Sequence, residues 1–279
     1  KVDIVTSQPL INYRETSRGS AGPIMAKSPN RHNKIFMKIE PLDEKVAEVI
    51  RNGTLNEYKD KKEVAEILKA VGWDKDDAKR VMRFDVRGNV MVDGTKGVQF
   101  VQESTDSILS GFDDTMKEGP LTREQVRGCK FTFNHFVPHE DPAHRGLSQL
   151  GPASRRACMG AMLLAQPVLL EPTLGIEVRI PQELIGNVAG VISGKRGKVL
   201  NMEQKGVVNI ITGEIPASET FDLSEVMRGQ TAGKAMWNTH FKAWTPVPNS
   251  ILSTIVADLR KRKGLSPEPP TADEFVDKE

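Results

Sequence analysis

Apolar and polar residues alternate in two stretches of residues 1–42, a pattern that is typical of β-strands. The second stretch, residues 33–42, places its apolar side chains on one face. Residues 18–33 lie between the two stretches and are rich in Gly, Ser, Pro and Asn. This composition predicts a long hairpin loop that joins two strands.

Apolar residues recur every three or four positions in the next part of the chain, which is the spacing of amphipathic helices. Residues 43–83 have this pattern around Val64 and Leu68, with Lys and Glu between, and predict a solvated helix packed on a sheet. Residues 97–118 have the same pattern, and Gly119-Pro120 ends this second predicted helix.

A strand pattern returns at residues 129–137. We expect a loop over residues 138–151 and then a helix from Pro152 to Ala165, because the first turn of a helix tolerates the missing N–H of proline. The most apolar stretch, residues 157–170, is shorter than the roughly 20 residues of a membrane-spanning helix. We therefore predict a soluble protein.

Residues 172–247 have the pattern of a separate unit with the order β-α-β-β-α-β. The predicted strands are residues 173–180, 197–204, 207–216 and 235–244, and the predicted helices are residues 181–193 and 223–229. This order is typical of a ferredoxin-like sandwich. With the separate runs of strands and helices before it, it places the chain in the α+β class with two domains.

The last predicted helix, residues 249–263, is amphipathic and ends in the basic run Arg260-Lys261-Arg262-Lys263. Two interpretations of this run stay open: cations matched to the dipole at the end of a helix, which the spacing favours, and a patch that faces RNA. Residues 265–279 follow with five acidic residues, one Lys and three Pro, for a net charge of −4. They predict an extended or loosely docked tail.

The composition limits the classes of protein that fit. The chain of 279 residues has 39 Lys and Arg against 37 Asp and Glu, so its net charge of +2 argues against a surface coated for nucleic-acid binding. Cys129 and Cys158 form no C-x-x-C pair, which predicts two buried thiols in a reducing compartment. The chain begins at Lys1 without a leader sequence, so we expect a cytoplasmic fragment of a longer protein.

Two loops contain residues that could bind or react. Residues 27–34 combine cations with Asn and Ser donors, so they fit contacts to RNA phosphates and base edges as well as they fit a solvated hairpin tip. Residues 138–146 contain His139 and His144, which are five positions apart and do not match a helical zinc motif. This second loop predicts either a rigid tip that presents His144 and Arg145 outward or an ordinary polar loop.

Residues 190–196 are similar to a phosphate-binding P-loop, but the similarity is incomplete. The glycine spacing is one residue short, and Arg196 stands where Ser or Thr would hold magnesium. A helix that ends at Gly194 and a basic turn fit these residues better. The chain has no Ser-His-Asp order and no paired-carboxylate motif above chance. From motifs alone we predict that this chain is not an enzyme and holds no metal or cofactor.

Several sequence blocks, in their order along the chain, resemble one known family. They are Tyr13-Arg14-Glu15-Thr16, residues 27–33 (KSPNRHN), residues 95–99 (TKGVQ), His144-Arg145-Gly146, Arg155-Arg156, Ala165-Gln166-Pro167, Leu170-Glu171-Pro172 and residues 260–265 (RKRKGL). Together they are similar to the C-terminal part of elongation factor 2, the translocation GTPase of archaeal and eukaryotic ribosomes. The compact spacing between the blocks resembles the archaeal form.

The resemblance implies how the chain is divided. Residues 1–12 match the end of domain III, and residues 13–170 match domain IV, which has a ribosomal-protein-S5-like fold. Residues 171–247 match the ferredoxin-like domain V, and residues 248–279 match a C-terminal helix and tail that return to domain IV. The domain of the family that binds GTP and Mg²⁺ has no counterpart here, so the resemblance implies no GTP hydrolysis by this chain alone.

The resemblance also implies that two loops, residues 27–34 and 138–147, form the tip of domain IV. In the family this tip reaches the decoding centre and follows the tRNA–mRNA duplex. The residues that match the RNA-contacting tip are Lys27, Ser28, Pro29, Asn30, Arg31, His32, Asn33, His139, Arg145 and Gly146. His144 matches the histidine that the family modifies to diphthamide, and Leu147-Ser148 after it departs from the family pattern.

The implied partners are the ribosome, through its rRNA and decoding centre, tRNA with mRNA, and the enzymes that synthesise diphthamide. The resemblance implies a monomer without a membrane partner. Two alternative functions stay open. One is a related GTPase of ribosome biogenesis or the spliceosome, and the other is a metal-dependent hydrolase built on His139, Glu140, Asp141 and His144.

Overall fold

The computed structural model describes residues 10–56 and 58–278. The first predicted β-rich run and most of the segment matched to domain III lie outside these residues. The described chain divides into a larger unit, residues 14–169 with 248–278, and a smaller unit, residues 10–13 with 170–247. Each unit has its own apolar core.

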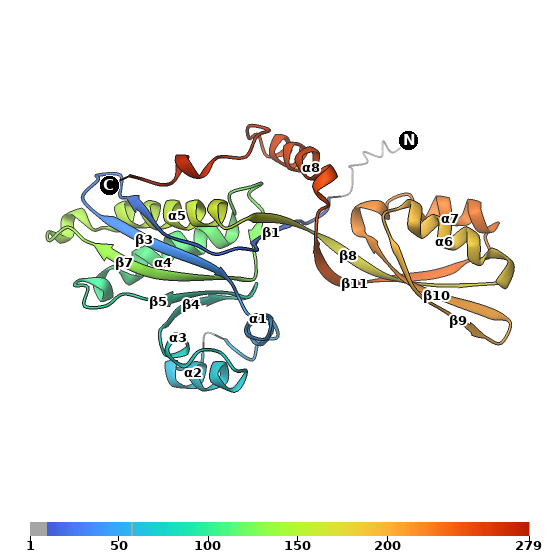
Figure 1. Ribbon diagram of the computed structural model, residues 1–279, viewed down its shortest axis with the longest axis horizontal. Coiled ribbons are helices and arrows are strands. Elements are labelled where there is room, and N and C mark those ends of the chain that lie inside the picture. The colour runs from blue at the N-terminus through green and yellow to red at the C-terminus, as the bar shows by residue number, and fades with distance from the viewer. Residues whose placement is uncertain (1–9, 57, 279) are drawn as a thin grey trace, which may run out of the picture. The chain divides into compact units, whose positions relative to one another are not determined.

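The larger unit is built on a mixed sheet in the order β2-β3-β7-β5-β4 (Figure 1). Its strands are β2 (Ala21–Lys27), β3 (Lys34–Pro41), β4 (Val81–Asp85), β5 (Asn89–Asp93) and β7 (Cys129–Val137). Strands β3 and β7 lie where their alternating apolar residues predict them. A short parallel pair, β1 (Arg14–Ser17) and β6 (Gln125–Val126), lies beside this sheet in the same unit.

The prediction of a long loop over residues 18–33 is wrong. Strand β2 occupies residues 21–27 of that segment, and only residues 28–33 form the hairpin loop. β2 is the edge strand of the sheet, where Pro23 is tolerated because an edge strand need not donate every ladder hydrogen bond. Met25 and Ala26 anchor the strand, since both side chains are buried in the core.

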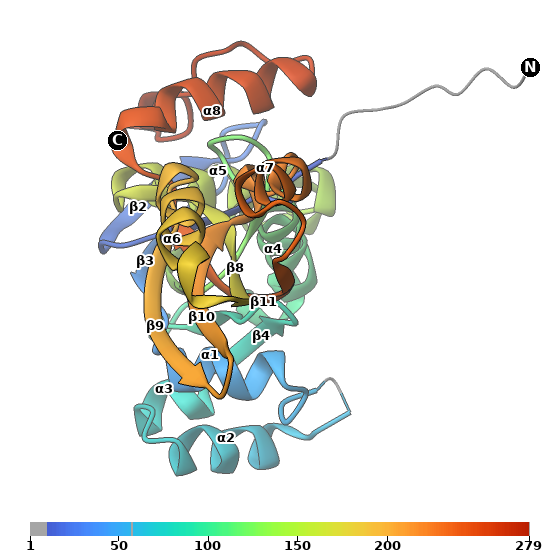
Figure 2. The ribbon, with the colours of Figure 1, turned by 90° about the vertical axis from the view of Figure 1, so that its right-hand side faces the viewer.

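Helices cover both faces of this sheet (Figures 1 and 2). They are α1 (Glu44–Arg51), α2 (Lys61–Ala70), α3 (Lys75–Lys79), α4 (Val101–Lys117) and α5 (Leu147–Leu164). Met91 of β5 packs into the core beneath α4 and α5, whereas Val90 and Val92 pack against α1, α2 and α3. Successive side chains of a strand point to opposite faces, so one apolar strand serves both cores.

Helix α5 begins at Leu147, earlier than the predicted start at Pro152. Gly146 precedes the helix, and its carbonyl accepts the first helical hydrogen bonds, so Pro152 lies inside the helix. The early start is favoured because Leu150 is fully buried. The helix also packs closely on α4: a Cβ atom at Gly111 would lie only 2.3 Å from the carbonyl oxygen of Gly151.

The smaller unit confirms the predicted β-α-β-β-α-β order. Its elements are β8 (Pro167–Ile180), α6 (Ile185–Gly194), β9 (Lys198–Lys205), β10 (Val208–Pro216), α7 (Leu223–Thr231) and β11 (Met236–Pro246). The strands lie in the order β11-β8-β10-β9, and α6 and α7 cover one face of their sheet (Figure 1). This is the arrangement of a ferredoxin-like sandwich, so the α+β class with two sheets is confirmed.

The last helix, α8 (Asn249–Arg262), is confirmed, and its basic end holds it to the larger unit. Arg260 donates to the carbonyl oxygens of Leu121 (2.7 Å) and Ser266. Lys263 donates to the carbonyl oxygens of Thr122 and Arg123, both at 2.9 Å. These two cations therefore bind protein carbonyls instead of facing outward as an RNA patch would require.

A buried carboxylate organises the loop to which α8 is held. Glu15 of β1 is 0% exposed and accepts hydrogen bonds from the backbone N–H groups of Leu121, Thr122 and Glu124 at 2.8, 2.8 and 3.1 Å. Burial raises the pKa of Glu15 above its usual range, although these hydrogen bonds oppose the shift. Gly119 is required beside it, because a Cβ atom there would lie 2.4 Å from a Glu15 oxygen.

Candidate functional site

The two predicted tip loops lie together at one end of the larger unit. Strands β3 and β7 are antiparallel neighbours, and Lys34 at the start of β3 pairs with Val137 at the end of β7. The hairpin loop of residues 28–33 therefore emerges beside the segment of residues 138–146 that follows β7. We call these two segments together the tip.

One buried amide joins the two loops of the tip. Asn33 is 0% exposed, and its Nδ2 donates to the carbonyl oxygen of His144 at 2.8 Å and to Ser28 Oγ at 3.0 Å. Its Oδ1 accepts the backbone N–H of His139 at 2.9 Å. A single side chain thus uses both donor hydrogens and its acceptor to connect three backbone turns, which makes the tip rigid.

Asn30 supplies a second connection, to the first turn of α5. Its backbone N–H donates to Gln149 Oε1 at 2.9 Å, and its Nδ2 donates to the carbonyl oxygen of His144 at 3.1 Å. Its Oδ1 accepts the backbone N–H of His32. The carbonyl of His144 therefore accepts hydrogen bonds from both Asn30 and Asn33, so the position of the His144 backbone is fixed twice.

The imidazoles of His32, His139 and His144 gather on the tip. Their ring centroids are 5.0 Å apart for His32 and His139, 5.1 Å for His32 and His144, and 4.6 Å for His139 and His144, with tilted or edge-on geometry. His32 is exposed and the other two are half-buried. Such rings present both π-faces and hydrogen-bonding edges, which single-stranded RNA uses in recognition.

The expectation that Arg145 points outward is wrong. Arg145 is only 6% exposed, and its guanidinium lies over the ring of Phe100 at 4.1 Å. It also forms an ion pair with Glu103 at 3.4 Å and donates to the carbonyl oxygen of Glu140. The turn at residues 142–144 directs its side chain toward α4, so Arg145 holds the tip in place from beneath.

The other predicted contact residues divide by exposure. The exposed ones are Pro29, Arg31, His32 and Gly146, and the half-buried ones are Lys27, Asn30 and His139. Ser28 and Asn33 are buried, so they support the tip from within, and their direct contacts with RNA stay a prediction. Arg31, in the left-handed backbone region at φ +61°, is the exposed cation at the turn of the hairpin.

The sequence analysis missed the contribution of the C-terminal tail. Asp277 accepts the backbone N–H of Lys27 at 2.8 Å and the guanidinium of Arg156 at 2.9 Å, and its own N–H donates to Met25. Burial alone would raise the pKa of Asp277, but these two partners outweigh it and lower that pKa. The resemblance implied a tail that returns to domain IV, and the acidic charge of the tail did not indicate which donors it would bind.

No metal site is apparent in the described part of the chain. Among the described residues, no group of three or more His, Cys, Asp or Glu side chains is placed to hold an ion, and this includes those around His139 and His144. In the same described residues, no helix is long and apolar enough to cross a membrane. Cys129 and Cys158 are buried free thiols, as predicted.

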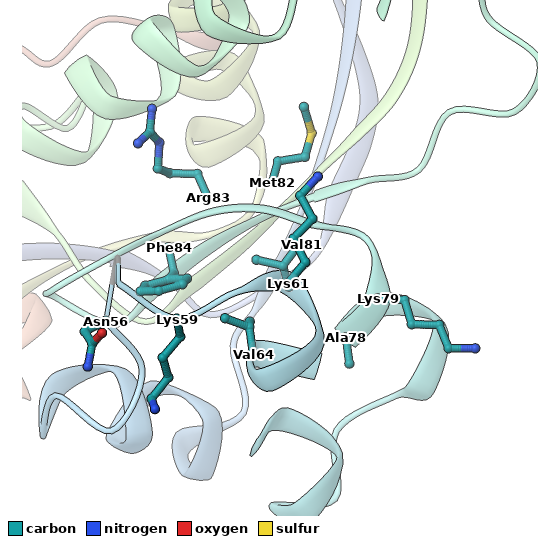
Figure 3. A pocket seen from close by; sticks show the side chains of 10 residues that line it. All are labelled: Asn56, Lys59, Lys61, Val64, Ala78, Lys79, Val81, Met82, Arg83 and Phe84. Atoms are coloured by element: carbon teal, nitrogen blue, oxygen red, sulfur yellow. The ribbon is translucent and has the colours of Figure 1, made fainter. Parts of the chain in front are cut away.

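A cavity of about 250 Å³ lies between α2, α3 and β4, away from the tip (Figure 3). Val64, Ala78 and Phe84 give it an apolar lining. Figure 3 shows the long side chains of Lys79 and Arg83 pointing away from it, and Arg83 pairs with Asp113 at 3.4 Å. Its cations therefore do not converge on a common ligand.

Comparisons with known proteins match both units. The family model for elongation factor G domain IV matches residues 48–166, and the model for the elongation factor G C-terminus matches residues 168–265. The elongation factor 2 of Cenarchaeum symbiosum (strain A) is 67% identical over 279 residues, which are 100% of this chain and 38% of that protein. That of Metallosphaera sedula is 46% identical over 276 residues, 99% of this chain and 38% of that protein.

The elongation factor 2 of Sulfurisphaera tokodaii is 47% identical over 276 residues, 99% of this chain and 37% of that protein. The chain thus spans less than two fifths of the length of these relatives. Their shared name does not favour a GTPase of ribosome biogenesis or the spliceosome, nor a metal-dependent hydrolase. The resemblance seen in the sequence is confirmed, and the chain belongs to the elongation factor 2 family, of which it contains domain IV and the C-terminal domain.

Proposed function

We propose that the chain is the ribosome-facing arm of a factor that promotes GTP-dependent translocation of tRNA and mRNA, with its tip at the decoding centre and the tRNA–mRNA duplex. The observation that carries this proposal is the rigid tip itself. Asn33 joins its two loops, and Arg31 with three imidazoles stands on its surface. A cation and a cluster of imidazole rings on a fixed frame suit a moving RNA duplex.

His144 is the proposed site of diphthamide. Its backbone carbonyl is held by Asn30 and Asn33, while its ring is half-buried beside His32 and His139. A modified ring there would extend from a fixed backbone, which suits a precise contact with RNA. Peptide mass spectrometry on protein from the native organism tests this assignment. An unmodified peptide that contains His144 would contradict it.

The proposal also assigns different tasks to this chain and to the other domains of the factor. GTP and Mg²⁺ belong to a domain outside this chain, so the chain has no catalytic residue and holds no cofactor. It acts in the cytoplasm as a monomer, with the ribosome, tRNA and mRNA as partners and the diphthamide enzymes as modifiers. A GTPase assay on the purified chain should give no hydrolysis above the buffer rate.

The decisive experiment measures single-round translocation by the full-length factor. Arg31→Gln and His144→Gln should each slow translocation at least about tenfold, because a charge-assisted hydrogen bond contributes about 1.5–3 kcal/mol. Arg262→Gln is the matched control, since Arg262 is an exposed cation outside the tip. Unfolding curves for all variants should coincide. Wild-type rates in both tip variants would contradict the proposal.

A further inference from the structure

A second cavity of the larger unit has a volume of about 400 Å³. It is lined by α5, the loop after α4, the end of α8 and the C-terminal tail. All these segments belong to one unit of the chain. Its volume falls within the range of about 300–1,000 Å³ that is typical of small-ligand pockets.

Arginines dominate the polar lining of this cavity: Arg123, Arg155, Arg156 and Arg260. Arg155 pairs with Glu118 at 3.2 Å and Arg156 with Asp277 at 2.9 Å. Among the described lining residues there is no Asp or Glu. Ion pairs therefore compensate the charges of Arg155 and Arg156, and the remaining positive charge of the lining comes from Arg123 and Arg260.

Two of these arginines have no acidic partner among the described residues. Arg260 donates only to the carbonyl oxygens of Leu121 and Ser266, and the exposed side chain of Arg123 makes no hydrogen bond or ion pair within the described chain. Burial lowers the pKa of Arg260, and the nearby charge of Arg123 lowers it further, while the charges of Glu15 and Glu274 oppose part of this shift. An anion bound between the two would relieve this repulsion.

The remaining lining residues are apolar. They are Gly119, Pro120, Pro152, Met159, Leu265, Pro270 and Phe275, of which Phe275 has an aromatic ring. A simple anion would contact only the arginines and leave these walls unused. A ligand that combines a phosphate with a planar ring would use both, because bases stack on aromatic faces and guanidinium groups bind phosphate in bidentate fashion.

We infer that this cavity binds one phosphorylated nucleoside, and that the nucleotide is an unpaired residue of RNA. The phosphate lies between Arg123 and Arg260, and the base lies against the proline and phenylalanine walls. An acidic peptide fits less well, since peptides are bound along extended grooves and this is a single compact cavity. The choice of RNA as the source rests on the proposed function, whereas the nucleotide chemistry rests on the cavity alone.

Calorimetric titration of the purified chain tests the inference with four probes: a 5′-phosphorylated tetra-adenylate RNA, AMP, inorganic phosphate and tetraglutamate. The RNA and AMP should bind with one-to-one stoichiometry and compete with each other. Arg123→Gln should weaken both about tenfold, since it removes one charge-assisted contact to phosphate. Arg262→Gln removes the same charge from an exposed position outside the cavity and should change both affinities less than twofold.

A second variant tests the apolar lining of the cavity separately from the charge of its arginines. Phe275→Leu should weaken RNA and AMP severalfold and leave phosphate binding unchanged, because it removes a stacking face and keeps the charge. Hydrogen exchange at the Lys27 amide, which donates to Asp277, shows whether the tail remains docked in this variant.

Four results would overturn the inference: phosphate binding as tightly as AMP, tetraglutamate as tightly as RNA, AMP binding without RNA binding, or equal losses in the Arg123 and Arg262 variants. The translocation assay separates this test from the proposed function. A tip variant that translocates normally counts against the function, whatever the titration of the cavity gives.

Discussion

Two loops of the larger unit are each organised by one fully buried polar side chain, and the two side chains differ in kind. Asn33 joins the tip with a neutral amide that donates twice and accepts once. Glu15 gathers residues 121–124 with a carboxyl group that only accepts. A neutral amide keeps its hydrogen bonds at any pH, whereas a carboxyl group makes its loop sensitive to pH.

The largest effect is expected from Glu15→Ala. The substitution leaves the N–H groups of Leu121, Thr122 and Glu124 buried without their acceptor, and it loosens the loop that receives Arg260. We expect a loss of about 3–5 kcal/mol in the free energy of unfolding of the larger unit. Urea unfolding followed by hydrogen exchange of the β3 and β7 amides measures it. A loss below 1 kcal/mol would show that water replaces the carboxylate without cost.

Asn33→Ala should have a smaller and more local effect. It removes the hydrogen bonds to His139 and His144, at an expected cost of about 1–3 kcal/mol. Exchange of the backbone amides should accelerate in the tip and stay unchanged in β5 and α4. Ser28→Ala is the comparison variant, because it removes hydrogen bonds within the hairpin loop and keeps those from Asn33 to His139 and His144. Uniform acceleration through the unit would contradict a role confined to the tip.

The stability of the larger unit should depend on pH through both Glu15 and Asp277, in opposite directions. The pKa of Glu15 is raised by folding, so its contribution is present below the ordinary pKa of Glu and is lost as the pH rises through the folded pKa. The pKa of Asp277 is lowered, so its contribution is present above the ordinary pKa of Asp and is lost as the pH falls through the folded pKa.

Unfolding curves across pH 3–8 should therefore respond in opposite directions to two variants. The Glu15→Gln variant should lack the decline in the free energy of unfolding that Glu15 causes as the pH rises. The Asp277→Asn variant should lack the decline that Asp277 causes as the pH falls. The backbone amide of His139, which donates to Asn33 Oδ1, should keep its protection from exchange in both variants, because Asn33 does not titrate. A loss of this protection in the Asp277→Asn variant would mean that Asn33 alone does not fix the tip.

The apolar framework of this molecule could be predicted and its polar supports could not. Strand β7 and the βαββαβ order follow from periodicity, because apolar residues are buried wherever a strand or helix packs. Asn33 and Glu15 belong to sequence blocks that reveal the family. Their burial is invisible in the sequence, since polar residues are usually exposed and only the tertiary structure shows which backbone groups they satisfy.

The directions of neighbouring side chains could not be predicted from the sequence either. His144 and Arg145 are adjacent in the sequence, and both were expected on the surface of the tip. The turn at residues 142–144 sends one outward and the other onto Phe100, a contact between segments that are far apart in the sequence. Pro152 misled the prediction for α5 for a related reason: the packing of Leu150 determines the start of that helix more strongly than the preference of proline does.

The smallest expected effect concerns the reactivity of the two buried thiols, Cys129 and Cys158. Burial raises the pKa of Cys129 to about 11, and it raises the pKa of Cys158 as well. Because the thiolate is the reactive form, neither should react with a disulfide reagent at pH 7 over hours in the folded chain. Glu15→Ala should expose Cys129 first, since Thr16, the neighbour of Glu15, contacts its sulfur. Equal rates at the two thiols in that variant would mean that Glu15 supports the whole core and not its own loop alone.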